Sequence, residues 1–385
     1  MNCNAMSFTI QGKIEGLTPG DTLSFERITM PGWSLDYAFD VIMEKPNEFT
    51  YNGSHEHIEY YLMTYKPVLG KVTDSDRRGL IMLIKDGATR IIGTADQIYY
   101  CQLEDGLYDN EVLQKALQLD ISLGKERGNL MRLLKESRIA KDTIKENEYI
   151  DKLNSLQSDR QDDYRKLSQL NNEFHEKFPS SEHTIVYFLE RVNSAPFATS
   201  LSKYEKMDKE AQDSYFGRIL KQEIDKIAVL QPGNKAPDFH LTAIDGRKIS
   251  LSDCIGSYVL IYHWGLCPGS MMIDNEVINL YNKYKDHLTV IGVTDKIESI
   301  KNEYDNTKSG SKYMDIELKS VLENMLAHPW FEAEKTGNNG KIEIDYGFAG
   351  FPYFVFISPD GEIIARDYQD AFYMAKRTME FEFGK

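Results

Sequence analysis

One short stretch, residues 258–270, constrains the fold more than any other part of the chain. It begins with a continuous run of aliphatic, β-branched and aromatic side chains, which predicts a buried strand. Cys267 and Pro268 follow, and after them residues 271–284 carry apolar side chains at helical spacing. Pro268 suits the first turn of a helix, because it has no N–H to leave unpaired. A cysteine between a core strand and a helix start faces the helix dipole and free N–H groups, which favour a thiolate.

Length and charge set the broad class. A chain of 385 residues predicts two or three domains. It carries 45 Lys and Arg against 60 Asp and Glu, a net charge of −15. This excess of negative charge argues against nucleic-acid binding, which needs a basic surface, and against electrostatic docking to anionic lipid. There is no run of about 18 apolar residues, so we expect no membrane-spanning helix.

The cysteines define neither a metal site nor a disulfide scaffold. The chain has four, Cys3, Cys101, Cys254 and Cys267, and no two of them form a C-x-x-C pair. No Cys/His cluster has zinc spacing, so we predict no metal site, and no motif indicates a cofactor.

The N-terminus leaves two interpretations open. The segment from Met1 has no apolar h-region, so no signal peptide is visible. Cys3 followed by a short polar spacer is also how a mature bacterial lipoprotein begins, which would make Cys3 a lipid anchor and place the true start upstream of Met1. The alternative is an incidental cysteine.

Residues 1–108 predict a small antiparallel β-sandwich. Short alternating segments recur at about ten-residue spacing, separated by turn residues, and the segments 8–16 and 22–28 predict a hairpin. His55 and His57 lie at strand spacing. A metal pair is one interpretation, but a solvated strand end is favoured because no third ligand lies nearby.

The rest of the chain changes character twice. Residues 109–228 are charged and show helical periodicity, which predicts a helical linker or packing region. After a Pro/Gly cluster, residues 229–385 predict an α/β domain. The strand before Cys267, its helix and the strand 288–293 form a βαβ unit. We expect 295–340 to be helical and 354–364 to be strand, turn and strand.

Residues 229–385 resemble thioredoxin-like proteins of the TlpA/ResA type, in the AhpC/TSA superfamily. The matching segments are 233–239 (GNKAPDF), 249–253 (ISLSD), 264–268 (WGLCP) and 350–361 (GFPYFVFISPDG). The resemblance implies a thioredoxin-like fold with Cys267 as nucleophile. It also implies that Pro352 is cis and that the substrate binds at Trp264, Pro268, Phe351 and Pro352.

A looser resemblance covers the remainder. An N-terminal β domain and a helical middle region commonly precede this module in proteins of Gram-negative bacteria. That arrangement implies a periplasmic location or a lipid anchor in the cell envelope. The whole chain is thus expected to be multidomain: a β-sandwich, a helical middle region and a C-terminal α/β thioredoxin-like fold.

One departure from the family pattern decides the chemistry. The family's C-x-x-C motif reads Cys267-Pro268-Gly269-Ser270 here, so Ser270 stands at the position of the resolving cysteine. Cys267 can still attack a disulfide, but Ser270 cannot release the adduct. A resolving thiol must come from elsewhere. Cys254 is one option, although a buried small hydrophobic role is favoured for it.

Four residues near Cys267 carry further expectations. Peroxidase chemistry is disfavoured, because the peroxidase branch has threonine where this chain has Trp264. His263 could influence the thiol, but a simple hydrogen bond is favoured. Asp274 and Glu276, on the following helix, are expected to face solvent.

These observations leave three functional hypotheses. The first is a monothiol disulfide oxidoreductase that acts on a disulfide- or thiol-containing protein or peptide and depends on an external thiol reductant. The second is a redox-inactive thioredoxin-fold module that binds peptides or proteins. The third is isomerase-like disulfide shuffling, which needs only Cys267. Reactivity of Cys267 separates the chemical hypotheses from the binding one.

Overall fold

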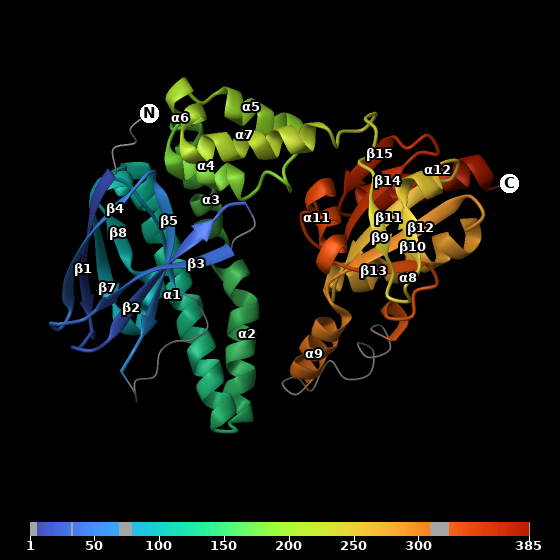
Figure 1. Cartoon of the computed structure of the whole chain (residues 1–385). Coiled ribbons are helices and arrows are strands. Elements are labelled where there is room, and N and C mark those ends of the chain that lie inside the picture. Colours follow the sequence, from blue (N-terminus) through green and yellow to red (C-terminus); the bar gives the residue numbers. More distant parts are fainter. Residues whose placement is uncertain (1–5, 32–33, 69–78, 309–322, 385) are drawn as a thin grey trace. The chain divides into compact units, whose positions relative to one another are not determined.

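The computed structural model describes the chain apart from residues 1–5, 32–33, 69–78, 309–322 and 385. The described chain divides into two compact units (Figure 1). The first contains Met1–Arg191 and Ser202–Lys221, and the second contains Val192–Leu201 and Gln222–Lys385. The helical region therefore packs mainly within the first unit, while the predicted boundaries at 108 and 228 stay a prediction.

The first unit contains a sandwich of two four-stranded sheets. One sheet has the order β4 (Glu48–His55), β1 (Met6–Glu15), β7 (Gly87–Thr94) and β8 (Gln102–Glu104). The other has the order β3 (Ser34–Ile42), β2 (Thr22–Thr29), β5 (Glu59–Lys66) and β6 (Leu80–Ile84). Alternate residues of β1 and β2, such as Ile10 and Phe25, meet in one buried core between the sheets.

Two details of the predicted sandwich are wrong. The sheets are not purely antiparallel, because β1 pairs with β7 in parallel. The segments 8–16 and 22–28 do not form a hairpin, because β1 pairs with β4 and β7 whereas β2 pairs with β3 and β5. Both segments show the same alternation, since each buries one face in the same core from opposite sheets. Alternation reports a buried face and not the neighbouring strand.

After the sandwich the chain forms a series of helices, which belong partly to the first unit and partly to the second. They are α1 (Glu111–Ile139), α2 (Thr143–Asp159), α3 (Gln161–Lys177), α4 (Glu182–Leu189), α5 (Phe197–Glu205), α6 (Lys209–Asp213) and α7 (Tyr215–Ala228). Asn110 begins α1, because its side chain accepts hydrogen bonds from the amides of Val112 and Leu113. The described helices include none that is both long and apolar enough to cross a membrane.

The second unit is built on a five-stranded sheet. Its order is β13 (Phe331–Glu334), β12 (Leu288–Thr294), β11 (Tyr258–Trp264), β14 (Tyr353–Ile357) and β15 (Ile363–Asp367). β11, β12 and β13 are parallel, whereas β14 and β15 run antiparallel to their neighbours. The predicted βαβ unit is confirmed as β11, α8 (Pro268–Tyr284) and β12.

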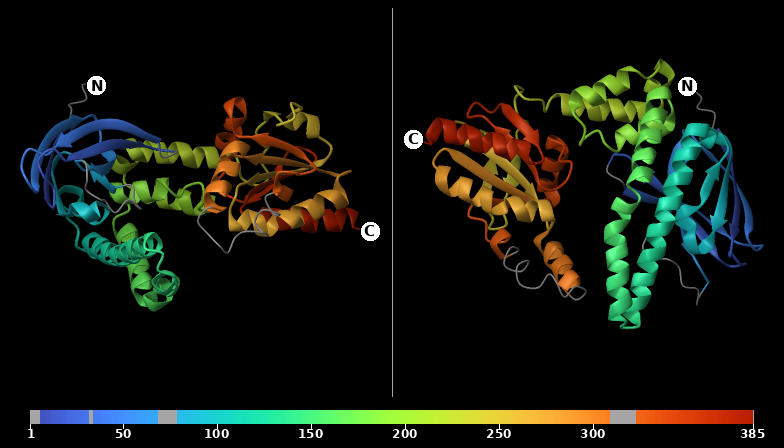
Figure 2. Two further views of the ribbon diagram at one scale, coloured as in Figure 1. Left: turned by 90° about the horizontal axis from the view of Figure 1, so that it is seen from below. Right: turned by 180° about the vertical axis from the view of Figure 1, so that it is seen from behind.

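Two layers cover this sheet. α8 and α12 (Asp370–Phe383) pack on one face, where they run side by side (Figure 2, right). The short hairpin of β9 (His240–Thr242) and β10 (Lys248–Ser250) and the helix α11 (Lys341–Tyr346) contribute to the core on the other face. β11 is buried on both faces, which explains its continuous apolar run.

The expectation of a helical segment over 295–340 is wrong in its second half. α9 (Ile297–Lys308) is a helix, but β13 adds a third parallel strand at Phe331–Glu334. Only Phe331 and Ala333 of this strand point into the core, so its apolar signal is too short to stand out. Residues 309–322 of the same segment lie outside the described part.

Candidate active site around Cys267

Cys267 stands at the N-cap of α8, directly beyond the end of β11. Its backbone is extended, and its half-buried sulfur accepts a hydrogen bond from the amide of Ser270, with 3.4 Å between N and Sγ. Pro268 occupies the first turn, as its missing N–H allows. The predicted position of the cysteine between strand and helix is therefore the one observed.

Ser270 is held beside this sulfur. Its side chain is fully buried, and its Oγ lies 3.3 Å from Sγ of Cys267. The amide of Gly265 donates to the same Oγ at 3.4 Å. The serine thus occupies, in space as well as in sequence, the place where a second thiol would resolve an adduct on Cys267.

The segment around Pro352 forms the opposite wall of the site. The Phe351–Pro352 peptide bond is cis, and the carbonyl oxygen of Phe351 lies 3.6 Å from Sγ of Cys267. The Phe351 ring packs against His263, with 4.4 Å between ring centroids, and the Lys335 ammonium lies 5.3 Å from its centre. Cys267, Pro268, Phe351 and Pro352 are therefore brought together, and their predicted roles in binding a substrate stay predictions.

Gly269 allows the start of α8 to approach Pro352. A Cβ on Gly269 would lie 2.8 Å from Cδ of the Pro352 ring. We expect Gly269→Ala to lower the free energy of unfolding by about 1 kcal/mol, because overpacking costs about 1–3 kcal/mol and helix propensity returns up to about 1 kcal/mol. Chemical denaturation measures it, and Asn275→Ala, at an exposed position of α8, is the control. A more stable Gly269→Ala would contradict the close contact.

His263 does not contact the sulfur through any hydrogen bond in the described structure. Its Nδ1–H donates to the carbonyl of Gly350 at 3.0 Å, and its ring stacks on Phe348. Burial, with the positive charge of Lys335 in second place, lowers the pKa of His263 to about 3. His263 is therefore neutral, and its role is the hydrogen-bonded one that the sequence favoured.

Trp264 is buried in the core beside residues of α8. Its indole is fully buried, and its N–H donates to Oε1 of Glu332 at 2.6 Å. Its predicted role in substrate binding stays a prediction, but this burial restricts Trp264 to an indirect contribution.

A buried carboxylate–imidazole cluster lies behind the site, formed by Asp274, His328 and Glu332. Nε2 of His328 lies 2.9 Å from Oδ1 of Asp274, and Nδ1 lies 2.9 Å from Oε2 of Glu332. The Trp330 indole also donates to Glu332, at 3.1 Å. The expectation that Asp274 faces solvent is wrong, because its side chain is only 3 % exposed.

Sequence reasoning missed this cluster, although one signal was present. Asp274 lies three residues before Val277 and four after Ser270, so it belongs to the buried stripe of α8. His328 and Glu332 gave no such signal, because their partner is 54 or more residues away along the chain. Glu276, by contrast, is partly exposed and pairs with Lys376 at 2.9 Å.

The cluster predicts a pH-dependent stability. Burial opposes the charge on His328, but hydrogen bonds with Asp274 and Glu332 and their negative charges outweigh it and raise its pKa to about 9. A raised folded-state pKa contributes stability that is complete below the ordinary value near 6.5 and is lost as the pH rises to about 9. We expect a loss of up to about 3 kcal/mol across this window, measured by urea denaturation. His328→Gln should remove this pH dependence, and an unchanged slope would contradict the assignment.

Cys254 is poorly placed to resolve an adduct on Cys267. Cys254 precedes the first residue of β11 in the chain. Its side chain is buried, and this burial raises the pKa of its thiol to about 11. Strands rise about 3.3 Å per residue, so the two ends of the seven-residue β11 lie about 20 Å apart. Cys101 is buried in the first unit, and Cys3 lies outside the described residues.

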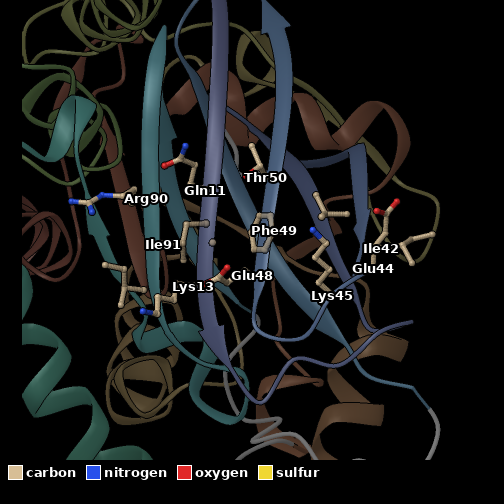
Figure 3. Close-up of a pocket in the computed structure, with 13 residues that line it drawn as sticks. Gln11, Lys13, Ile42, Glu44, Lys45, Glu48, Phe49, Thr50, Arg90 and Ile91 are labelled. Carbon is tan, nitrogen blue, oxygen red and sulfur yellow. The ribbon is translucent and has the colours of Figure 1, made fainter.

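The sandwich holds a separate cavity of about 570 Å³ at the edge strands β3 and β4 (Figure 3). Phe49 lies across Gly12 inside it, with Lys13, Glu48 and Arg90 around it. These side chains carry charges of both signs, so they do not indicate one class of ligand.

The two histidines of the sandwich do not behave alike. His55 is buried and stacks on Phe8 with 4.8 Å between centroids, so the predicted solvated strand end is wrong for it. His57 stacks on Tyr215 at 3.6 Å. Among the described residues no group of three or more His, Cys, Asp or Glu side chains is arranged to hold a metal ion.

The strand order, the cysteine at the start of α8 and the adjacent cis-proline segment define a thioredoxin-like fold of the kind found in thiol-disulfide oxidoreductases. Residues 232–321 match the AhpC/TSA family. The chain is 30% identical over 155 residues to the thiol-disulfide oxidoreductase ResA of Bacillus cereus, covering 39% of this chain and 72% of that protein. It is also 30% identical over 139 residues to ResA of Bacillus anthracis, covering 35% of this chain and 68% of that protein. The chain therefore belongs, through its C-terminal part, to the thioredoxin-like AhpC/TSA family.

Solved structures resemble the same part. The thioredoxin domain of a thiol-disulfide oxidoreductase from Bacteroides vulgatus shares 22% identity at a TM-score of 0.29, covering 38% of this chain and 97% of its own. A thiol:disulfide interchange protein from Bacteroides sp. shares 24% identity at a TM-score of 0.30, covering 41% of this chain and 93% of its own.

Proposed function

We propose that this protein is a monothiol disulfide oxidoreductase in which Cys267 is the only nucleophile and an external thiol completes the reaction. The observation that carries the proposal is the half-buried Sγ of Cys267 at the start of α8, which accepts the amide N–H of Ser270. An N–H donor and the positive end of the helix dipole stabilise a thiolate relative to a thiol.

The chemistry balances with two external thiols. The Cys267 thiolate attacks one sulfur of the substrate disulfide, a mixed disulfide forms, and the other substrate sulfur leaves as a thiolate and takes up a proton. An external thiolate then attacks the substrate sulfur of the mixed disulfide and releases the Cys267 thiolate. A second external thiol converts the resulting mixed disulfide into the second substrate thiol. The substrate disulfide is reduced by two electrons while two external thiols become one disulfide.

The wall opposite Cys267 supports a peptide or protein as the substrate. The Phe351 carbonyl lies 3.6 Å from the sulfur, so an extended chain bound beside Pro352 would lie within reach of Cys267. Phe351 itself is partly exposed and offers an apolar contact.

Trapping of the mixed disulfide tests the proposal. The protein is incubated with oxidised glutathione, and the adduct is located by peptide mass spectrometry, with the reduction of insulin by glutathione as the turnover assay. We expect the adduct on Cys267 and a turnover rate that rises with the glutathione concentration. Absence of any adduct on Cys267 in the folded protein would overturn the proposal.

A redox-inactive binding module is the second candidate, favoured by one observation. Ser270 is fully buried at the resolving position, so the site holds a single thiol. This candidate predicts that calorimetry detects binding of a reduced peptide equally in the wild type and in Cys267→Ala, without turnover.

We also propose a location in the cell envelope, based on the arrangement of the domains and on the thiol-disulfide class. A lipid anchor at Cys3 is part of this proposal. Metabolic labelling with an alkyne fatty acid, followed by fractionation, tests it, with Cys3→Ala as the control. Labelling that persists in Cys3→Ala would contradict the anchor.

A further inference from the structure

The hydrogen bonds of the carboxylate–imidazole cluster define the charge of His328. Both ring nitrogens face a carboxylate oxygen at 2.9 Å, and a carboxylate can only accept. A neutral imidazole carries one N–H, so only the imidazolium donates at both positions. The His328 side chain is 1 % exposed, so this charge is held deep inside the protein between two carboxyl groups. Burial raises the pKa of Glu332, and the hydrogen bonds from His328, Trp264 and Trp330 oppose that rise.

The groups around the cluster hold its charged side chains in place. Glu332 accepts from both indoles, those of Trp264 and Trp330, in addition to His328. Tyr262 on β11 faces the cluster from the sheet side. A neighbouring cavity of about 340 Å³ is lined by His328 and Glu332 and also by the charged side chains Asp245, Arg247 and Lys301.

Tyr262 connects the cluster to the thiol site. Its hydroxyl lies 3.3 Å from Oδ1 of Asp274 and 3.4 Å from the carbonyl oxygen of Ser270. Ser270 and Asp274 are four residues apart on α8, so they occupy adjacent turns of one face. Ser270 in turn contacts Cys267 through its amide and its Oγ.

We propose that Asp274, His328 and Glu332 are positioning residues for Cys267: acting through Tyr262, they hold the first turn of α8 so that the Ser270 amide points at the sulfur. This inference rests on the proposed function, since it concerns the same thiol. The ion pairs connect α8, which covers one face of the sheet, to β13 and to the segment before it.

The charge on His328 strengthens the ion pairs that hold α8. If His328 loses its proton, one of its two carboxyl partners loses the hydrogen bond from His328, and no positive charge remains between these two buried groups. An unpaired buried charge is costly, so the cluster must rearrange or take up a proton elsewhere. We therefore expect the position of the Ser270 amide, and with it the reactivity of Cys267, to depend on the protonation of His328.

The rate of Cys267 alkylation by iodoacetamide tests this in the full chain. Wild-type and variant sites are compared in a background with Cys3→Ser, Cys101→Ser and Cys254→Ser, so that the rate reports Cys267. Tyr262→Phe removes only the hydroxyl and changes no charge, and His328→Gln removes the imidazolium. We expect each to lower the rate at neutral pH by about fivefold, the size of one weakened hydrogen bond. The double variant should be no slower than either single one, because both changes break the same connection.

The pH profile supplies a readout that general destabilisation would not change. In the wild type we expect the rate to carry an extra step near pH 9, where His328 titrates, and Tyr262→Phe should abolish that step. Equal rates in wild type and Tyr262→Phe, or additive losses in the double variant, would overturn the inference. If His328→Gln does not fold, Tyr262→Phe and its pH profile decide the question.

Failure of this inference is distinguishable from failure of the proposed function. Iodoacetamide reads the thiol without any disulfide substrate. A wild type that forms no mixed disulfide but shows the coupled alkylation rates contradicts only the function. A wild type that forms the mixed disulfide with unchanged variant rates contradicts only the positioning role.

Discussion

In a protein that carries Cys3→Ser, the further change Cys267→Ser is expected to abolish the mixed disulfide with oxidised glutathione and to reduce insulin turnover to the rate without protein. A hydroxyl cannot form a disulfide, and Cys254 and Cys101 are buried with raised pKa values. The fold should persist, because serine is among the best N-cap residues and replaces Cys267 at the N-cap of α8. Mass spectrometry and the turnover assay measure the loss, and circular dichroism checks the helix content.

The matched controls are Cys254→Ser and Cys101→Ser. Each keeps Cys267, so each should form the adduct at the wild-type rate. An adduct that survives in Cys267→Ser and disappears in Cys254→Ser would show that Cys254 is the nucleophile. That outcome would contradict the assignment of the site.

Ser270→Cys is expected to convert the site into a dithiol that works without an external thiol. The Ser270 Oγ lies 3.3 Å from the Cys267 sulfur, so a thiol at this position starts close to the atom that it must attack. The new thiol attacks the Cys267 sulfur of the mixed disulfide, the substrate leaves as a thiolate, and an intramolecular disulfide forms. Each reduced protein molecule should then reduce one substrate disulfide.

The measurement is a single-turnover reaction of the reduced, desalted protein with insulin. Ser270→Cys should release substrate thiols and lose both of its own site thiols, while wild type stops at the mixed disulfide. Ser270→Ala removes the hydroxyl without adding a thiol and should behave like wild type. The larger sulfur in a fully buried position is expected to cost about 1 kcal/mol in the reduced state. A Ser270→Cys protein that still needs glutathione would contradict the geometry of the site.

The C-terminal fold could be predicted because its strongest signals are local and continuous. β11 is buried on both faces and therefore reads as one apolar run, and the start of α8 is marked by Pro268. β13 could not be predicted, because a four-residue strand with two buried side chains gives almost no periodicity. The predicted strand pairing in the sandwich was wrong for a different reason. The alternation of β1 and β2 shows which faces are buried but does not show which strands pair.

The candidate site, too, could be predicted only in part from the sequence. Cys267 and the serine at the resolving position are three residues apart, so helix geometry alone brings them together. Phe351 and Pro352 were assigned to the same site only by resemblance to the family, because Phe351 lies 84 residues further along the chain. Asp274 was assigned to solvent because the groups that donate hydrogen bonds to its carboxylate, on His328 and Tyr262, come from other elements.

The sequence by itself determined that a cysteine follows a core strand at the start of a helix, and that no second thiol stands three residues later. Both are properties of neighbouring residues, whose spacing is set by the regular geometry of strand and helix. Only the tertiary structure decided what surrounds that cysteine: the Phe351 carbonyl on one side, and the buried Asp274–His328–Glu332 cluster behind Ser270 on the other. These groups meet because the sheet order places β13, β11 and β14 in one layer, and burial then gives their charges and hydrogen bonds a strength that spacing along the chain does not reveal.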